Sequence, residues 1–325
     1  MSVVFADIEE AARRLAGFAV ETPVIESPIL NARAGGRVLV KAECLQRTGS
    51  FKFRGAWNAI SQLDPAVHKG GVVAFSSGNH AQGVAAAAEI RGLPALIVMP
   101  ADTPEIKQAN TRSYGGEVVT YDRATEDREA IAAKYLEQRG AVLIPPFEHK
   151  DVIAGQGTAG LELADEAARR GVALDDVLVC CSGGGLTAGI ALAMEAKSPA
   201  TRVHSVEPAG FDDTARSLRS GRRETNARAS GSICDALLSV QPGAMTFAIN
   251  HPRLGEGLVV TDAEAAEAVR YAFEVLKLVV EPGGAVALAA VLSGKIVTRG
   301  RNIGVIASGG NADPELYARI LRREI

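Results

Sequence analysis

Residues 176–189, DVLVCCSGGGLTAG, decide the fold class of this chain. An apolar, strand-like run leads directly into Ser182-Gly183-Gly184-Gly185, and a segment typical of a helix follows. A glycine-rich turn between a strand and a helix lets free backbone amides at the helix N-terminus approach an anion. Three consecutive glycines lose much conformational entropy on folding, which is unfavourable for a turn that holds no ligand. The stretch therefore predicts a βα unit that binds a phosphate group.

The same alternation of strand and helix extends along the chain. It predicts parallel βαβ units and an α/β fold with helices flanking parallel sheets. Residues 95–100 and 177–181 are apolar throughout, as in strands that helices cover on both faces. The predicted strands are 38–43, 72–76, 95–100, 117–122, 176–181, 201–207 and 302–308, and the predicted helices include 51–63, 79–92, 152–170, 185–196 and 284–293.

Composition excludes several classes of protein. The chain has 325 residues, of which 47% are hydrophobic and 22% charged, so it is typical of a folded globular protein rather than a disordered one. At roughly 150 residues per domain, the length predicts two domains, or one large domain with an insertion. The net charge of −3 gives no general attraction to nucleic acid or to an anionic membrane. The sequence contains no run of about 18 apolar residues, so no membrane span is predicted.

The cysteines and the N-terminus indicate the compartment. Cys44, Cys180, Cys181 and Cys234 form no CxxC pair, so neither a zinc site nor a disulfide framework is predicted. The first residues include acids and lack a long apolar core, unlike a secretory signal. A reducing cytoplasm is therefore the predicted location.

The glycine-rich turn has a second interpretation. Gly183, Gly185 and Gly189 form GxGxxxG, and Glu207 follows about 20 residues later, as an acidic residue does in dinucleotide-binding folds. An NAD(P)-dependent oxidoreductase is thus an alternative. The spacing is one residue longer than the usual fingerprint, however, and another motif dominates the first third of the chain.

That motif is RTGSFKFRGA, residues 47–56. Lys52 lies at the start of a predicted helix between Phe51 and Phe53. A lysine at such a position is usually solvated. Here the positive end of the helix and the shielding phenylalanines would both lower the pKa of its amine, which favours a neutral nucleophile.

The chain resembles the fold-type II pyridoxal-phosphate enzymes, in the branch of threonine/serine dehydratases and serine racemases. This resemblance implies a tryptophan synthase β-like fold. It also implies a large cofactor-binding domain of residues 1–68 and 147–325 and a small mobile domain of residues 69–146. The segments that carry it, in family order, are 45–56, 76–85, 152–158, 182–189, 206–208, 278–290 and 307–311.

The resemblance implies specific roles around pyridoxal 5′-phosphate. Lys52 would bind the cofactor covalently and, once released, move the α-proton of the substrate. Phe51 would pack on the pyridine ring, and Asn79 would hydrogen-bond its phenolic oxygen. Ser308 would face the ring nitrogen. A hydroxyl there leaves the ring unprotonated and a weaker electron sink, which favours prompt loss of a β-substituent.

The phosphate of the cofactor would be held by backbone amides of the turn. Relatives often have four glycines here, whereas this chain begins with a serine, whose hydroxyl can also donate a hydrogen bond. The residues implied are Ser182, Gly183, Gly184, Gly185 and Leu186.

A second block would bind the substrate carboxylate through amides and hydroxyls at a helix start. It consists of Ser76, Ser77, Gly78, Asn79 and His80. Ser77 also matches the second acid/base of serine racemases, on the ring face opposite the lysine. Its alternative role is that of a carboxylate-binding hydroxyl.

The resemblance further implies a divalent-cation site at Glu207, Phe211 and Asp213. Two carboxylates, one backbone carbonyl and waters would form an oxygen shell suited to Mg²⁺ or Ca²⁺. Without the resemblance, these acids would be interpreted as helix caps. Glu281 recurs in the family near the cofactor, where it would act without touching it.

The predicted activity is therefore that of an ammonia-lyase of amino-acid metabolism, which converts L-threonine or L-serine to a 2-oxo acid and ammonia. Racemisation of serine or another amino acid and dehydration of 3-hydroxyaspartate are alternatives on the same scaffold. The predicted partner is a small amino-acid substrate, with no nucleic acid and no membrane. A homo-oligomer, either a dimer or a tetramer, is expected.

Overall fold

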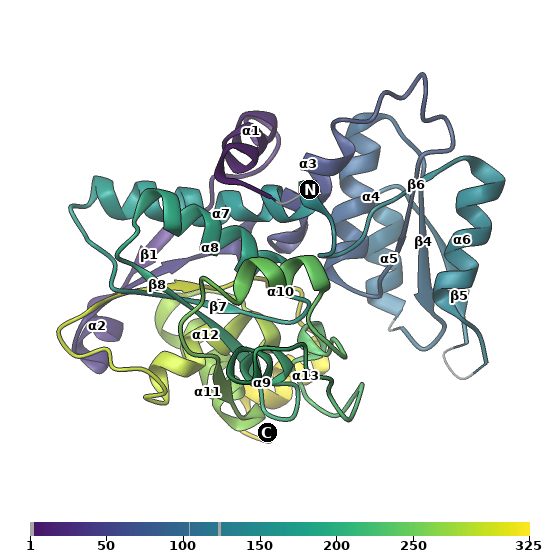
Figure 1. Ribbon diagram of the computed structural model, residues 1–325. Coiled ribbons are helices and arrows are strands. Elements are labelled where there is room, and N and C mark those ends of the chain that lie inside the picture. Colours follow the sequence, from purple (N-terminus) through teal and green to yellow (C-terminus); the bar gives the residue numbers. More distant parts are fainter. Residues whose placement is uncertain (1–2, 104, 123–124) are drawn as a thin grey trace.

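The computed structural model describes residues 3–103, 105–122 and 125–325. Two sheets organise them, as Figure 1 shows. The larger sheet has the order β1 (Val24–Glu26), β2 (Arg37–Lys41), β10 (Asn302–Ile306), β7 (Asp176–Cys180), β8 (Arg202–Pro208) and β9 (Leu258–Val260). The smaller sheet has the order β5 (Gly116–Tyr121), β4 (Ala95–Pro100), β3 (Val72–Phe75) and β6 (Val142–Leu143).

Strand direction confirms the predicted α/β class. Every neighbouring pair of strands is parallel except β1 and β2, which are antiparallel at one edge. All residues of β4 and β7 are buried, as expected for parallel strands covered on both faces. The two sheets agree with an expected division near residues 69–146, but the domain boundaries and the mobility of the small part stay predictions.

Helices cover both faces of the larger sheet. Figure 1 shows α7 (Lys150–Arg169) and α8 (Gly185–Lys197) on one side, and α11 (Asp262–Tyr271) and α12 (Pro282–Leu292) on the other. Around the smaller sheet lie α4 (Asn79–Arg91), α5 (Glu105–Ser113) and α6 (Arg128–Arg139). The remaining helices are α1 (Phe5–Leu15), α2 (Pro28–Ala34), α3 (Lys52–Ile60), α9 (Asp213–Ser220), α10 (Ala244–Asn250) and α13 (Pro314–Leu321).

Short helical turns connect these elements. They are η1 (Glu43–Leu45), η2 (Arg47–Gly49), η3 (Asp235–Leu237) and the π-helical turn η4 (Ala272–Leu276). Among the described residues, no helix combines the length and the apolar character that a membrane span needs.

Gly189 has a packing role. A Cβ at this position would lie 2.5 Å from the carbonyl oxygen of Ile153 and 2.6 Å from the backbone nitrogen of Gly157. Real side chains cannot approach so closely, so only glycine lets α8 pack directly on α7. The third glycine of the GxGxxxG pattern is therefore explained by helix packing, which removes one reason to see a dinucleotide fingerprint here.

One buried cluster joins the two parts of the molecule. It includes Ala74 and Ile97 from the smaller sheet together with Leu192 and Ala193 from α8. A separate apolar core lies between the larger sheet and the helices that cover it. Because both parts share apolar contacts, the segments between the two sheets are held in defined positions.

Candidate functional site

The predicted motifs converge at the carboxyl ends of the parallel strands. The backbone N–H of Phe51 donates to the carbonyl of Ser308 at 3.1 Å, and Ser50 and Gly309 form an antiparallel bridge. Asn311 donates to the side-chain oxygen of Asn79 at 2.7 Å. Three segments far apart in the sequence thus meet where ligands of open parallel sheets bind.

Lys52 begins α3, with its side chain partly buried. Its Nζ donates to the carbonyl of Pro146 at 2.9 Å and lies 5.1 Å from the centroid of the Phe51 ring. Burial lowers the pKa of this amine from 10.5 to about 8. The ring of Phe51 stabilises the cation, but removal from water outweighs it. A useful neutral fraction therefore exists near physiological pH.

Phe53 does not shield Lys52 as the sequence suggested. It is fully buried, stacks on Trp57 at 6.3 Å between ring centroids and belongs to the cluster shared by both parts. Successive residues of a helix point in directions about 100° apart, so both neighbours of a lysine at a helix start cannot flank its amine. The shielding comes from Phe51 and from desolvation.

The glycine-rich turn presents free amides. Gly184 has φ +90°, a conformation that favours glycine, and a Cβ there would lie 2.9 Å from Asn250. Thr246 donates to the carbonyl of Gly183 at 2.6 Å, and Asn250 donates to that of Gly184 at 3.2 Å. Because N–H and C=O point in opposite directions across a trans peptide, the amides of Gly184 and Gly185 face away from α10. The turn has the form of an anion cradle.

The Ser182 hydroxyl is already hydrogen-bonded within the protein, contrary to the predicted role as a donor to the phosphate. Its hydroxyl donates to the side chain of Ser239 at 2.8 Å and accepts from the Ser239 backbone N–H at 3.2 Å. These two bonds occupy the hydroxyl. In this structure Ser182 fixes the segment beside the turn, and the cradle depends on backbone amides.

Asn79 is the first residue of α4 and is held from two directions. Its amide nitrogen donates to Glu281 at 2.6 Å, and its oxygen accepts from Asn311. Glu281 caps the start of α12 and is buried. Burial and the charge of Asp235 raise its pKa to about 7, against the hydrogen bond from Asn79. Glu281 thus orients Asn79, and Asn311 is a contributor that the sequence did not single out.

Only part of the segment Ser76–His80 is exposed where a ligand could contact it. Ser76, Ser77, Gly78 and Asn79 are partly exposed between β3 and α4, whereas His80 is buried. Its Nε2 lies 2.8 Å from the carbonyl of Ile144, and burial followed by the charge of Lys52 lowers its pKa to about 3. His80 is therefore a neutral ring in the wall beneath the segment.

Ser308 follows β10 and is 5% exposed. Its Oγ accepts a hydrogen bond from the thiol of Cys180 at 3.0 Å. Cys180 is the last residue of β7, and one residue separates it from the turn that begins at Ser182. No signal in the sequence marked this pair, because the two residues are far apart in the chain and a buried cysteine has no distinctive pattern.

Glu207 and Asp213 lie near each other at the end of β8. Glu207 accepts from the backbone N–H groups of Thr214 and Ala215, and Asp213 accepts from Asn226 at 2.5 Å. Burial raises the pKa of Asp213 to about 6, and burial together with the charge of Asp213 raises that of Glu207. The second oxygen of Asp213 is buried and has no partner within the described residues.

A cation bound at these carboxylates stays a prediction. A divalent ion would neutralise both acids and take up the unpaired oxygen. The described chain has no cluster of three or more His, Cys, Asp or Glu side chains arranged for a metal. A backbone oxygen, for which buried Phe211 remains the predicted source, and water would therefore have to complete the shell.

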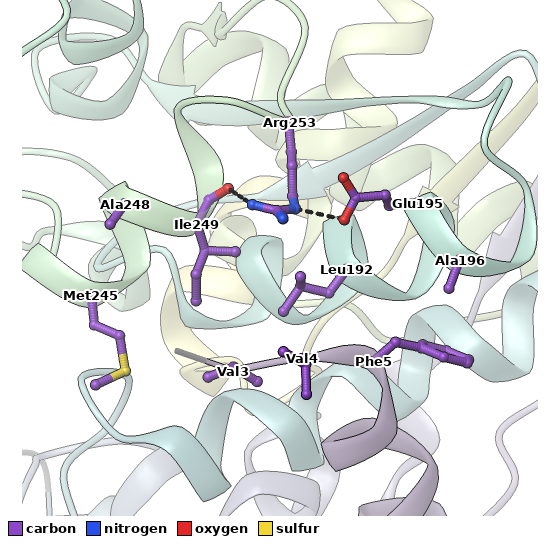
Figure 2. A pocket seen from close by; sticks show the side chains of 10 residues that line it. All are labelled: Val3, Val4, Phe5, Leu192, Glu195, Ala196, Met245, Ala248, Ile249 and Arg253. Carbon is purple, nitrogen blue, oxygen red and sulfur yellow. Dashed lines mark hydrogen bonds and ion pairs between the residues drawn. The ribbon is translucent and has the colours of Figure 1, made fainter. Parts of the chain in front are cut away.

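A cavity of about 460 Å³ lies away from these residues, between the N-terminal segment, α8 and α10 (Figure 2). Its walls are mainly apolar, and its polar pair is Arg253 with Glu195 at 2.8 Å. None of the predicted site residues lines it. The candidate site is therefore the junction of motifs rather than this cavity.

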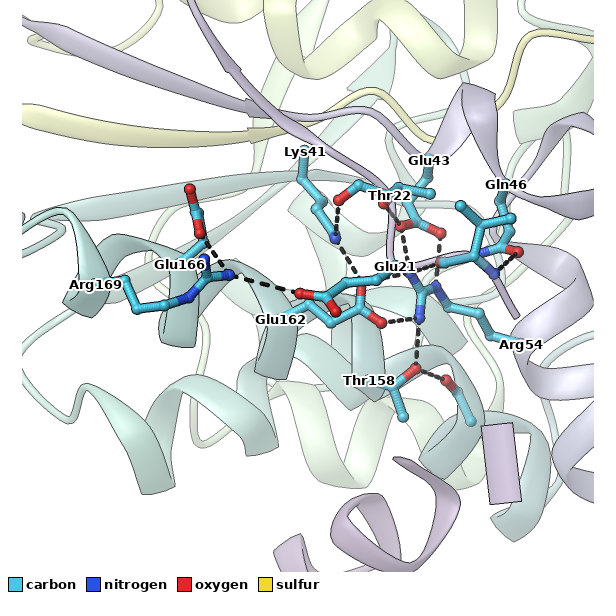
Figure 3. A network of polar contacts seen from close by, with 12 residues as sticks. Glu21, Thr22, Lys41, Glu43, Gln46, Arg54, Thr158, Glu162, Glu166 and Arg169 are labelled. Atoms are coloured by element: carbon cyan, nitrogen blue, oxygen red, sulfur yellow. Dashed lines mark hydrogen bonds and ion pairs between the residues drawn. The ribbon is translucent and has the colours of Figure 1, made fainter. Parts of the chain in front are cut away.

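Figure 3 shows a network of ion pairs around Arg54, Glu43, Glu162 and Lys41. Arg54 is fully buried on α3 and pairs with Glu43 at 2.7 Å and Glu162 at 2.6 Å. Lys41 also pairs with Glu162 at 2.5 Å. Two cations and two carboxylates balance in charge and tie α3 to β2, η1 and α7.

Comparison with known proteins agrees with this geometry. Residues 15–309 match the family described as "Pyridoxal-phosphate dependent enzyme". The chain belongs to this family. Its relatives are fold-type II enzymes, so the phosphate cradle indicates pyridoxal phosphate as the cofactor, in preference to a nicotinamide dinucleotide.

Similar members of the family differ in reaction. An L-threo-3-hydroxyaspartate ammonia-lyase from a Pseudomonas species is 47% identical over 97% of this chain and 98% of its own length. A serine racemase from Schizosaccharomyces pombe is 42% identical over 97% and 96%. The solved structure of maize serine racemase has a TM-score of 0.92 and 37% identity, and the match covers 100% of this chain and 98% of that one.

Proposed function

We propose that the protein is an ammonia-lyase that converts a β-hydroxy amino acid, L-serine or L-threonine, to a 2-oxo acid and ammonia. The observation that carries the proposal is the environment of Lys52. Its amine lies at the junction of the motifs, contacts the Pro146 carbonyl and has a pKa of about 8. Ammonia-lyases among the relatives support the same reaction class.

The residues present fit pyridoxal phosphate. Lys52 would hold it covalently, Phe51 and Asn79 would contact its ring, and the amides at the start of α8 would bind its phosphate. Bound there, the cofactor supplies an electron-withdrawing ring that takes up the electrons released at the substrate Cα. The observation that supports this fit is the turn itself, because the carbonyls of Gly183 and Gly184 accept from Thr246 and Asn250 and the amides of Gly184 and Gly185 therefore face away from α10.

The chain itself would position the substrate and move its proton. The neutral Nζ of Lys52 takes the α-proton, as its lowered pKa allows. Amides at the start of α4, with the hydroxyls of Ser76 and Ser77, hold the carboxylate. Cleavage of the Cβ–O bond releases water, and hydrolysis consumes one water and releases ammonia and the 2-oxo acid.

L-threo-3-hydroxyaspartate is the alternative substrate. It has the same β-hydroxyl, and relatives from a Pseudomonas species and from Saccharomyces cerevisiae are named for it. It carries a second carboxylate, which needs a cation or hydrogen-bond donors in addition to the Ser76–His80 segment.

Racemisation of serine is the second candidate function. Ser77 favours it, because this hydroxyl is partly exposed between β3 and α4, where the sequence predicted an acid/base opposite the lysine. Serine racemases from yeast and plants are among the relatives. Both reactions begin with removal of the α-proton, so they can share Lys52.

The test combines cofactor binding with product analysis. The purified protein should show the absorption band of lysine-bound pyridoxal phosphate, and borohydride should abolish it. Lys52→Ala should lose the band and nearly all elimination. The control is Lys150→Ala, since Lys150 also starts a helix but makes only a surface ion pair with Asp7. Retention of both properties by Lys52→Ala would contradict the proposal.

Three parallel assays would determine which substrate the protein converts. L-Serine, L-threonine and L-threo-3-hydroxyaspartate are supplied separately, and the 2-oxo acid, ammonia and any D-amino acid are measured. Formation of ammonia in proportion to 2-oxo acid supports the lyase. Formation of D-serine without ammonia would contradict the lyase proposal and indicate a serine racemase.

A further inference from the structure

The hydrogen bond between Cys180 and Ser308 has a defined direction. The thiol donates and the hydroxyl oxygen accepts, at 3.0 Å between sulfur and oxygen. The two residues lie on adjacent strands of the larger sheet, since Cys180 ends β7 and Ser308 follows the neighbouring strand β10. Both side chains are almost completely buried.

The backbone of Ser308 is fixed on both sides. Its N–H donates to the carbonyl of Gly284 at 3.3 Å, and its carbonyl accepts from Phe51 at 3.1 Å. A serine hydroxyl has a single hydrogen to donate and two lone pairs. In the described part of the chain, Ser308 Oγ accepts from Cys180 and donates to no protein group. Its hydrogen therefore remains for a group bound beside it.

The thiol stays a donor at ordinary pH. Burial raises the pKa of the Cys180 thiol to about 11. The charged groups that act on Cys180 are Glu281 at the start of α12 and Lys52 on α3. Asp235 on η3 and Lys107 on α5 act in turn on Glu281.

We propose that Cys180 is a positioning residue, whose thiol orients the Ser308 hydroxyl to donate toward the ring nitrogen of the cofactor and so keeps that nitrogen unprotonated. The inference rests on the proposed function, which places Ser308 beside that nitrogen. A donor facing the nitrogen stabilises its lone pair, whereas a hydroxyl free to rotate could accept from a protonated ring. An unprotonated ring withdraws electrons less strongly, which favours elimination over racemisation.

The adjacent thiol provides a matched control. Cys181 is equally buried, but its sulfur lies near the hydroxyl of Thr214, at 3.4 Å, and the carbonyl of Ser182. Truncating Cys181 leaves a similar cavity without changing the hydrogen bond to Ser308. Cys180→Ser restores a donor in nearly the same volume and is the conservative rescue.

The experiment measures protonation of the ring nitrogen in the holoenzyme. The cofactor is labelled with ¹⁵N in the ring, and the nitrogen is titrated by NMR in the wild type, Cys180→Ala, Cys180→Ser and Cys181→Ala. A neutral hydrogen bond contributes about 1 kcal/mol, equivalent to about 0.7 pH unit. Cys180→Ala should raise the apparent pKa of the ring nitrogen by about that amount, and Cys180→Ser should reverse most of the change.

The variants separate hydrogen bonding from packing. An unchanged titration in Cys180→Ala overturns the inference, and so does an equal shift in Cys181→Ala, since the latter would indicate packing alone. A shift that Cys180→Ser does not reverse also overturns it. If Cys180→Ala does not fold, the Cys180→Val variant, which keeps the volume but lacks a donor, must show the shift. A wild type that binds no cofactor overturns the proposed function itself.

Discussion

The pKa of Lys52 sets the pH at which its amine can react. Its pKa is lowered from 10.5 to about 8, so the reactive neutral amine becomes available at a lower pH. The rate at which pyridoxal phosphate attaches to the apoenzyme should rise about tenfold from pH 6 to 7 and level off above pH 8. Stopped-flow absorbance measures this rate. A rate that kept rising tenfold per unit to pH 10 would show an unperturbed lysine.

Ser77 separates two reactions that share the lysine. Removing a general acid/base group typically reduces a rate by about 10²–10⁴-fold. Ser77→Ala should therefore suppress any racemisation by about that factor and reduce elimination much less. The readout is solvent deuterium in D-serine formed from L-serine, compared with ammonia release.

The matched control for that variant is Ser76→Ala. Ser76 Oγ accepts from the backbone of Gly78 and helps to shape the same segment. Equal loss of both reactions in Ser77→Ala would identify its hydroxyl as a carboxylate ligand. Absence of deuterium from D-serine in the wild type would remove the racemase alternative.

The roles given to the residues of the motifs stay predictions, whereas the meeting of the segments that carry them is seen in the fold. The Lys52, Asn79 and Ser308 segments meet as expected, because each lies in a turn or helix start that follows a strand. The shielding assigned to Phe53 was wrong, since the helix turns that ring into the core. The Cys180 contact was missed because it joins two strands whose adjacency appears only in the folded sheet.

At the level of elements, the Arg54 network should anchor α3. Arg54→Met leaves the fully buried Glu43 and the partly buried Glu162 with Lys41 as the remaining cation of the network. Loss of one partner of a buried ion pair typically costs about 3–5 kcal/mol. Urea unfolding should show a loss of that size in the free energy of unfolding.

A surface pair supplies the control for that network. Arg139 pairs with Glu117 at 2.8 Å, but both side chains are about one-third exposed or more. Arg139→Met should cost about 0–1 kcal/mol. Equal losses in the two arginine variants would contradict the anchoring role of Arg54.

A divalent cation bound at the turn between β8 and α9 should stabilise the protein against unfolding. Mg²⁺ or Ca²⁺ at 100 times its dissociation constant should raise the free energy of unfolding by about 2.7 kcal/mol. Glu207→Gln and Asp213→Asn should remove this response, whereas Asp212→Asn should keep it, because Asp212 pairs with Arg216 on the exposed side. Thermal unfolding with and without chelator measures the effect. Unchanged melting of the wild type would show that the site binds no cation.

Elements with strong patterns were predicted, and short ones were not. The main strands and α3, α4, α7, α8 and α12 lie within a few residues of their expected bounds. The three-residue strands β1 and β9 were missed, because so few residues carry no periodicity. The seven-residue helix α10 was also missed. Sheet order depends on tertiary pairing and could not be derived from local patterns.

Across the whole molecule, an ion pair spans the two parts. Lys107 on α5 contacts Asp235 on η3 at 2.5 Å. The pair would favour a closed arrangement over the substrate. Lys107→Gln should raise KM for the amino acid by up to about fivefold, the factor for 1 kcal/mol, with little change in kcat. Lys134→Gln, at an exposed position on α6, is the control. An unchanged KM in Lys107→Gln would exclude the pair from substrate closure.

Assembly and compartment remain predictions at this scale. A dimer or tetramer would give a solution mass of two or four times 33.9 kDa. Light scattering of the purified holoenzyme measures this mass directly. The cytoplasmic location stays a prediction, and fractionation of the cells that make the protein would test it.

The order of strands also determines when the protein can finish folding during synthesis. β10 lies between β2 and β7, yet it is the last strand to be made. The smaller sheet comes from one continuous stretch, residues 72–143, and can form on the ribosome as soon as that stretch emerges. The edges of β2 and β7 stay unpaired until residue 306 has left the exit tunnel, and they expose apolar surface throughout that interval. Until β10 is made, these two unpaired strand edges are places where another chain could pair with the nascent protein.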